Sequence, residues 1–143
     1  MLIDMSKIKT VFLISTALLI MSLLSACGGI NPRDTLNGTS WILTSIDNTP
    51  PLNGTKLTVA FTGGKLNGSS GCNSYSGSYE INGEKISTGP IAMTLMACMD
   101  TDMMDQEQSF LAYLGDLKTF IRSEGQLQFF RSDGKALTFI PKG

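Results

Sequence analysis

The chain has 143 residues and is nearly neutral, with 11 basic and 12 acidic side chains and a net charge of −1. The lack of a basic patch or a block of like charges argues against a nucleic-acid partner bound through its phosphates. The chain contains no histidine, which excludes Ser-His-Asp and Cys-His catalysis and removes the commonest metal ligand.

The first element is an apolar run from Val11 to Leu24, which follows Lys7 and Lys9 and ends in Leu-Ser-Ala-Cys at Cys27. A charged start, an apolar middle and small residues before a cleavage point are typical of a secretory signal peptide. The stretch at Cys27 resembles the bacterial lipobox, in which the cysteine is lipidated and the chain is cut just before it. We predict a signal peptide over residues 1–26, with Cys27 as the lipid attachment site.

The alternative for this run is an uncleaved anchor with an idle thiol at Cys27, but the run is shorter than the about 20 apolar residues of a membrane span. We expect residues 27–38 to form a lipidated polar tether and residues 39–143 to form one globular domain. The residue after Cys27 is Gly28. An aspartate at that position would resemble an inner-membrane retention signal, and a glycine permits transfer to the outer membrane. The expected location is therefore the bacterial envelope, on the outer membrane facing the periplasm in a Gram-negative cell.

Short β-prone segments separated by turn residues make up most of the domain. The predicted strands cover residues 40–46, 56–61, 65–70, 76–81, 85–88, 119–123, 126–131 and 136–140. Asn82-Gly83 is a strong hairpin signal, and the last three strands read as a meander. Such a pattern with one helix predicts a mainly β (α+β) fold, a small antiparallel barrel or half-barrel with one amphipathic helix packed on it.

The predicted helix covers residues 102–114, with Asp100 or Thr101 as its N-cap and Gly115 at its end. Its apolar side is predicted to consist of Met103, Met104, Phe110, Leu111 and Leu114. Its first half is acidic, as the helix dipole favours. Asp100, Asp102 and Asp105 resemble the start of a calcium loop, but the glycine and the final glutamate of that loop are missing. No carboxylate pair is placed for acid–base catalysis, so we expect no enzyme, no catalytic residue, no metal and no cofactor.

Two cysteines remain once Cys27 is assigned to lipid. In an exported domain, Cys72 and Cys98 are most simply interpreted as a disulfide. Two free thiols for metal or redox chemistry are the alternative.

The methionines after residue 27 are gathered around Cys98. They are Met93, Met96, Met99, Met103 and Met104. Thioether and thiolate ligands select copper(I), so a copper- or redox-responsive periplasmic protein is one hypothesis. Methionine is also common core filler, and a third hypothesis is an exposed, adaptable surface for a protein partner.

Two stretches carry a family resemblance. The motif residues are Gly71, Cys72, Asn73, Tyr75, Gly77, Met93, Thr94 and Cys98. With Thr39-Ser40-Trp41 before them and Glu107 and Phe110 on the helix after them, they resemble the META domain family, which includes the heat-shock lipoprotein HslJ.

The resemblance implies a small β-rich fold in the envelope and a link to heat shock and to tolerance of the antibiotic novobiocin, but no reaction or substrate. We therefore expect a non-enzymatic binding or structural module in stress tolerance, held to the membrane by its lipid. Its expected partner is an envelope protein, and we expect a monomer.

The residue types of the motif favour a structural role. Gly71 and Gly77 suit a positive φ or a close backbone approach, and the Asn73 side chain can form a hydrogen bond with the backbone in a turn. Tyr75 and Tyr79 are predicted to share one face of a strand. A Gly-Cys-Asn loop that binds a ligand is the functional alternative.

Overall fold

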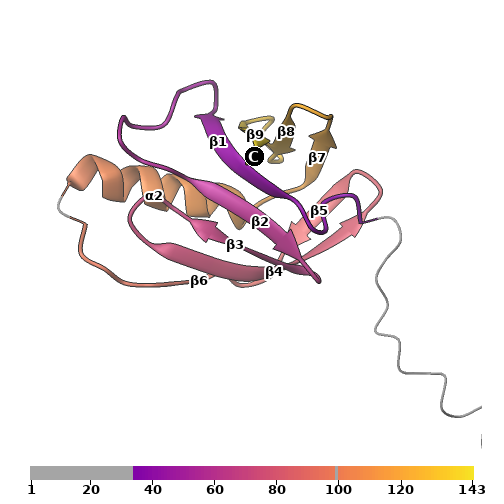
Figure 1. Ribbon diagram of the computed structural model, residues 1–143, viewed down its shortest axis with the longest axis horizontal. Helices are drawn as coiled ribbons and strands as arrows, with labels where there is room; N and C mark the ends of the chain where they lie inside the picture. The colour runs from indigo at the N-terminus through magenta and orange to yellow at the C-terminus, as the bar shows by residue number, and fades with distance from the viewer. Residues whose placement is uncertain (1–33, 99) are drawn as a thin grey trace, which may run out of the picture. The chain divides into compact units, whose positions relative to one another are not determined.

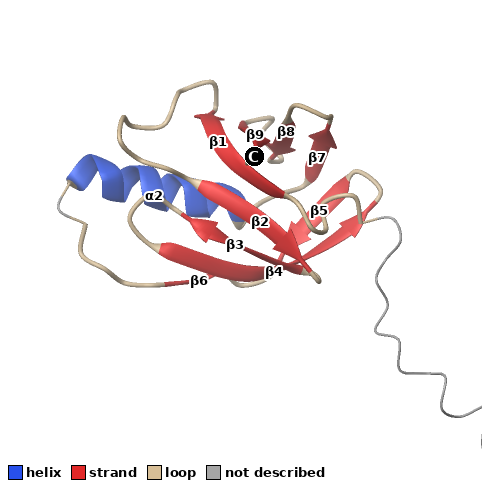
Figure 2. Cartoon of the chain, viewed as in Figure 1, coloured by secondary structure: helices blue, strands red, loops and turns tan. Residues whose placement is uncertain are grey.

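The computed structural model describes residues 34–98 and 100–143. The predicted signal peptide, Cys27 and Met99 lie outside these residues. The elements are β1 (Ser40–Ile46), β2 (Thr58–Thr62), β3 (Lys65–Ser69), β4 (Ser74–Asn82), β5 (Lys85–Thr88), β6 (Ala92–Met93), α2 (Thr101–Leu114), β7 (Thr119–Arg122), β8 (Leu127–Phe130) and β9 (Ala136–Pro141), as shown in Figures 1 and 2. Within the described part of the chain, no helix is long and apolar enough to cross a membrane.

Eight antiparallel strands close into a barrel in the order β3-β2-β1-β9-β8-β7-β5-β4, and β4 pairs back with β3. The closure depends on the length of β4, whose first part pairs with β3 and whose last part pairs with β5. The seam between β5 and β7 is short, with Lys85 opposite Thr119. The barrel, the packed helix and the C-terminal meander confirm the predicted fold class.

Alternation along the strands fills the barrel with apolar side chains. The wholly buried large residues are Leu36, Leu57, Val59, Phe61, Leu66, Phe110, Leu114, Leu127, Phe129, Leu137 and Phe139. Three pairs of rings meet edge to face, with centroids 5.0 Å apart for Phe61–Tyr79, 5.6 Å for Phe129–Phe139 and 5.7 Å for Tyr75–Phe110. Since Phe110 comes from α2, the helix is joined directly to the barrel core.

Helix α2 begins at the predicted cap, because the Asp100 carboxylate accepts a hydrogen bond of 2.9 Å from the Asp102 N–H. It ends at Gly115. The predicted apolar side is partly wrong, because Met104 is 41% exposed while Glu107 and Tyr113 are buried. At 3.6 residues per turn, Glu107, Phe110 and Leu114 lie within about 60° of one another around the helix. Met104 lies about 120° from Phe110 and about 80° from Leu114, at the edge of this buried face.

Residues 34–38, which the sequence placed in the tether, are part of the folded domain. Leu36 is wholly buried. The Asp34 carboxylate accepts hydrogen bonds from the Tyr79 hydroxyl (2.6 Å) and the Leu36 N–H (3.0 Å), and the Arg122 guanidinium donates to the Thr35 carbonyl. The domain therefore includes Asp34, five residues before the predicted boundary at Thr39.

The sequence prediction missed one strand, β6. It is only two residues long, and it pairs with β4 on the edge that β4 also presents to β5, with Met93 opposite Tyr75 and Ala92 opposite Ser76. The surrounding apolar run has no alternation to mark a strand. We call residues 89–98, which contain β6, the strap.

Candidate functional site

The two halves of the family motif meet where the loop between β3 and β4 faces the end of the strap. Cys72 from the loop and Cys98 from the strap form a disulfide, with their Cα atoms 6.0 Å apart. The disulfide interpretation of the two cysteines is therefore confirmed, and neither sulfur is a free thiolate in this structure.

Glu107 of α2 lies at the centre of this junction and is only 4% exposed. Its Oε2 accepts hydrogen bonds from the Ser70 hydroxyl (2.5 Å) and the Asn73 backbone N–H (2.8 Å). Its Oε1 accepts from the Asn73 side-chain amide at 2.7 Å. The helix thus holds the motif loop through one carboxylate.

The surroundings of Glu107 favour its charged form. Burial alone raises the pKa of this carboxyl group, but the hydrogen bonds from Ser70, from Asn73 and from the Cys72 backbone outweigh it and hold the pKa below its ordinary value of 4.5. No salt bridge within the described part of the chain involves Glu107. The negative charge is therefore stabilised by neutral donors.

Asn73 connects this carboxylate to the strap. Its Oδ1 accepts hydrogen bonds from the Thr94 hydroxyl and from the Met96 N–H, both at 2.8 Å. The prediction that Asn73 bonds its own turn was therefore wrong in its partner, because the side chain reaches a segment more than 20 residues away. Helix, loop and strap form one hydrogen-bonded unit.

The other motif residues fit this unit sterically. Gly71 has a φ of +113°, which favours glycine. At Gly77, a Cβ would lie 3.3 Å from the Pro90 carbonyl oxygen, because the strap passes close over β4. Tyr75 and Tyr79 are both buried on the inner face, as predicted, and the Tyr75 hydroxyl donates to the Thr58 carbonyl at 2.7 Å.

The strap itself exposes apolar side chains although its backbone is held. Leu95 is 90% exposed, Met96 61% and Met93 37%. Between the strap and α2 lies an open groove of about 420 Å³, with Ile91 and Met93 on one wall and Leu111 on the other. These side chains are the strongest candidates for contact with another molecule.

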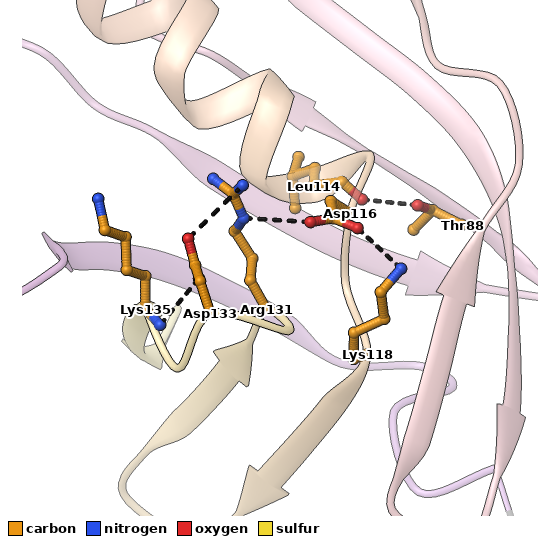
Figure 3. A network of polar contacts seen from close by, with 7 residues as sticks. All are labelled: Thr88, Leu114, Asp116, Lys118, Arg131, Asp133 and Lys135. Carbon is orange, nitrogen blue, oxygen red and sulfur yellow. Dashed lines mark hydrogen bonds and ion pairs between the residues drawn. The ribbon is translucent and has the colours of Figure 1, made fainter.

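A network of charged side chains lies at the opposite end of the helix (Figure 3). The Asp116 carboxylate contacts Lys118 Nζ at 2.7 Å and Arg131 Nε at 3.3 Å, which lowers the pKa of Asp116. The Arg131 guanidinium also lies over the Tyr113 ring, 4.8 Å from its centroid. The Leu114 carbonyl accepts from the Thr88 hydroxyl at 2.6 Å. The network fixes the end of the helix against β5 and the turn that follows β8.

The polar groups of the site are used in holding the structure together. Among the described residues, no buried side-chain nitrogen or oxygen lacks a hydrogen-bond partner, and no group of three or more Cys, Asp and Glu side chains is placed to hold a metal ion. The arrangement holds an apolar strap rigidly, and the polar groups of the motif point inward.

A family model described as the META domain matches residues 34–143. The chain belongs to the META domain family. This META domain is similar to the NMR structure of a protein from Burkholderia xenovorans, with 30% identity and a TM-score of 0.61 over 75% of this chain and 83% of that chain. No curated protein matches the chain.

Two more distant solved structures share the fold alone. One is a second NMR structure, with 19% identity and a TM-score of 0.62 over 76% of this META domain protein and 92% of that chain. The other is the crystal structure of a DUF4847 family protein from Bacteroides vulgatus, with 11% identity and a TM-score of 0.56 over 76% and 95% of the two chains.

The sequence places Glu107 in the family resemblance and in the acidic first half of the helix, but it does not predict the buried roles of Glu107 and Ser70. A signal was present, because Glu107 shares the spacing of Phe110 and Leu114, and a carboxylate on that apolar row needs buried donors. Ser70 carries no such signal, since its role depends on a contact with a residue far along the chain.

Proposed function

We propose that this META domain protein is a non-enzymatic binding module of the bacterial envelope, held to the membrane by a lipid on Cys27. The observation that carries the proposal is the strap, whose backbone is fixed by a disulfide and by Asn73 while Leu95 and Met96 remain exposed. Apolar side chains on a fixed backbone bind a partner at a lower cost in conformational entropy than the same side chains on a mobile loop. Exposed apolar clusters are typical of interaction surfaces.

The membrane anchor is supported by the sequence around Cys27, seven residues before Asp34, where the described domain begins. Residues 27–33 extend at most about 25 Å, so the domain would stay close to its membrane. The expected location is the outer membrane facing the periplasm in a Gram-negative cell, because Gly28 follows Cys27.

Mass spectrometry tests the anchor. The protein purified from membranes is expected to begin at residue 27 with a lipid-sized increment on Cys27, and Cys27→Ser is expected to abolish the increment. Recovery of an unprocessed chain with an unmodified Cys27 would contradict the anchor.

The proposed role in heat and novobiocin tolerance is tested in a strain that lacks the protein. Complementation with the natural chain is expected to restore growth, whereas Leu95→Ser combined with Met96→Ser is expected to fail at equal protein level. Ile121→Ser is the matched control, since Ile121 is also exposed (56%) but lies on β7 outside the strap. Equal growth with the strap variant and the control would contradict a role of the strap in stress tolerance. A separate result, a turnover activity that is lost when one polar residue is changed, would refute the non-enzymatic role.

A copper- or redox-responsive protein is the second candidate, favoured by the two exposed thioethers of Met93 and Met96 on one strap. Because Cys72 and Cys98 form a disulfide, this candidate requires their reduction before thiolate ligands are available. It predicts stoichiometric copper(I) binding by the reduced protein, weakened by Met93→Ala and Met96→Ala. A titration that shows no binding by the reduced protein would exclude it.

A further inference from the structure

The strap has an unpaired edge that faces the groove beside α2. In the β4–β6 ladder, Ala92 and Thr94 are the hydrogen-bonding positions, because the Thr94 N–H donates to the Ser74 carbonyl at 3.0 Å and bonding positions alternate. Met93 therefore directs its N–H and C=O away from β4. Every other strand of the described domain has neighbours on both sides in the closed ring.

The groove along this edge has the dimensions and lining for a peptide. Its volume of about 420 Å³ lies in the range of about 300–1,000 Å³ that ligand sites occupy. Ile91, Met93 and Leu111 supply apolar walls, and Thr88 and Gly115 line it as well. The Thr88–Leu114 hydrogen bond fixes the end of α2 beside β5, and the Cys72–Cys98 disulfide fixes the end of the strap.

Charge is distributed unevenly near the groove. Strap residues 89–98 carry no charged side chain, and the helix that follows begins with Asp100, Asp102 and Asp105, all exposed. None of the salt bridges in the described part of the chain involves these three carboxylates. These carboxylates would repel an anionic lipid surface and attract a protein segment that carries basic side chains.

We propose that this groove binds an extended apolar segment of a partner protein, which adds as a strand to the free edge of β6 and carries Lys or Arg beside the start of α2. Strand addition supplies main-chain hydrogen bonds at Met93, and the groove walls select alternating apolar side chains. This inference rests on the proposed function of a binding module and names the chemistry of its partner.

The test uses residues 27–143 with Cys27→Ser, so that no detergent competes for the groove. The probes are seven-residue peptides with Val or Leu at alternate positions and two lysines at one end or the other. Binding is measured by fluorescence anisotropy, and protection of the Met93 N–H by amide hydrogen exchange. We expect at least one of these peptides to bind and to protect Met93, and its counterpart with glutamates in place of the lysines to bind at least tenfold more weakly.

Two matched variants separate strand addition from simple apolar contact. Met93→Pro removes the N–H that faces the groove but no β4 hydrogen bond, and proline is tolerated at such edge positions; it is expected to weaken peptide binding at least tenfold. Met93→Val keeps the N–H and an apolar side chain and is expected to change binding less than threefold. Equal binding by both variants would overturn the proposal, after unfolding curves have shown that both are folded.

Other occupants give different results. If anionic vesicles bind through the strap and no peptide binds, the edge belongs to a membrane contact and the proposal is overturned. If the chain forms a dimer that Met93→Pro dissociates, the edge binds a second copy of the chain and the proposal is also overturned. If no peptide binds while the Leu95 and Met96 double variant still loses stress tolerance, the groove proposal fails and the proposed function stands.

Discussion

Glu107 is a buried, ionised carboxylate that neutral donors stabilise. Its three hydrogen bonds of 2.5–2.8 Å come from Ser70 and Asn73, so the charge is held by the same residues that position the motif loop. Removing a partner of a buried charged hydrogen bond costs about 1.5–3 kcal/mol. Among the described residues, Glu107 is the one charged residue that is buried.

We expect Glu107→Gln to destabilise the domain by about 2–3 kcal/mol at pH 7, because the glutamine NH₂ group is a donor where the carboxylate had an accepting oxygen, so that it faces another donor and both lack an acceptor. Urea unfolding followed by the fluorescence of Trp41, which is the only tryptophan and is buried, measures the loss. Equal unfolding midpoints for the variant and the natural protein would show that the carboxylate is not needed.

The pH dependence of this difference follows from the lowered pKa of Glu107. A carboxyl group whose pKa is lower in the folded state stabilises the fold fully above its unfolded value of about 4.5, and this contribution is lost as pH falls through the folded value. The gap between the natural protein and Glu107→Gln is therefore expected to be constant from pH 7 to about 5 and to narrow below that. Urea unfolding curves between pH 7 and pH 3 test this, and a gap that widens in acid would contradict the assignment.

Gly68 marks a close backbone approach that lies outside the family motif. A Cβ at this position would lie 2.0 Å from the Thr58 carbonyl oxygen, next to the hydrogen bond from Tyr75. Gly68→Ala is expected to cost about 1–3 kcal/mol, as overpacking does. Gly125→Ala is the control, because nothing lies within 4 Å of its added Cβ. Similar unfolding midpoints for the two variants would disprove the close approach.

At the scale of elements, the disulfide and Asn73 attach the strap to both the β3–β4 loop and α2. The strap contributes only the two-residue β6 to the sheet, so its order comes from cross-links rather than from strand pairing. This explains how a segment with exposed Leu95 and Met96 keeps one conformation.

Reduction of the Cys72–Cys98 bond is expected to lower the free energy of unfolding by roughly 3–4 kcal/mol, because the bond closes a loop of 26 residues. Cys72→Ala combined with Cys98→Ala is expected to match the reduced natural protein, and reductant is expected to leave this double variant unchanged. Denaturant unfolding with and without reductant measures both. A natural protein that is insensitive to reductant would contradict the prediction.

At the scale of the molecule, the N-terminal segment and the tip of the strap lie at opposite ends of β3. The Asn37 side chain accepts a hydrogen bond from the Gly63 N–H in the turn before β3, whereas Asn73, which holds Met96, follows the loop after β3. A five-residue strand separates the two ends by roughly 17 Å. The exposed side chains of the strap therefore lie at the end of the domain away from Asn37.

Residues 34–38 are expected to be required for full stability. A chain that begins at Thr39 loses the burial of Leu36 and the Asp34–Tyr79 hydrogen bond, and loss of a buried leucine side chain costs about 2–5 kcal/mol. A chain that begins at Asp34 is the control and is expected to unfold like one that begins at residue 27. Equal thermal midpoints for the Thr39 and Asp34 chains would show that the segment is dispensable.

The sequence by itself predicted a mainly β fold as a barrel or half-barrel, the helix with Asp100 or Thr101 as its cap, the meander, the family, and a Cys72–Cys98 disulfide as the simplest interpretation of the two cysteines. The strands, turns and helix cap depend on local signals, because alternation, turn residues and capping residues lie in neighbouring positions. The disulfide followed from the number of cysteines in an exported domain, and the family followed from two motif stretches. The assignments at Cys27 stay predictions.

Only the tertiary structure decided the role of Glu107, the closure of the ring by β4, the burial of Leu36 and the free edge of Met93. Each depends on contacts between residues far apart in the chain, for which the local pattern gives no register. The boundary at Thr39 failed for this reason, since Leu36 sits in a polar stretch and gains its apolar surroundings only when the barrel forms. The prediction that Met104 lies on the apolar side of the helix was wrong. The sequence shows which helix positions are apolar, but the way the helix packs on the barrel decides which of them are buried.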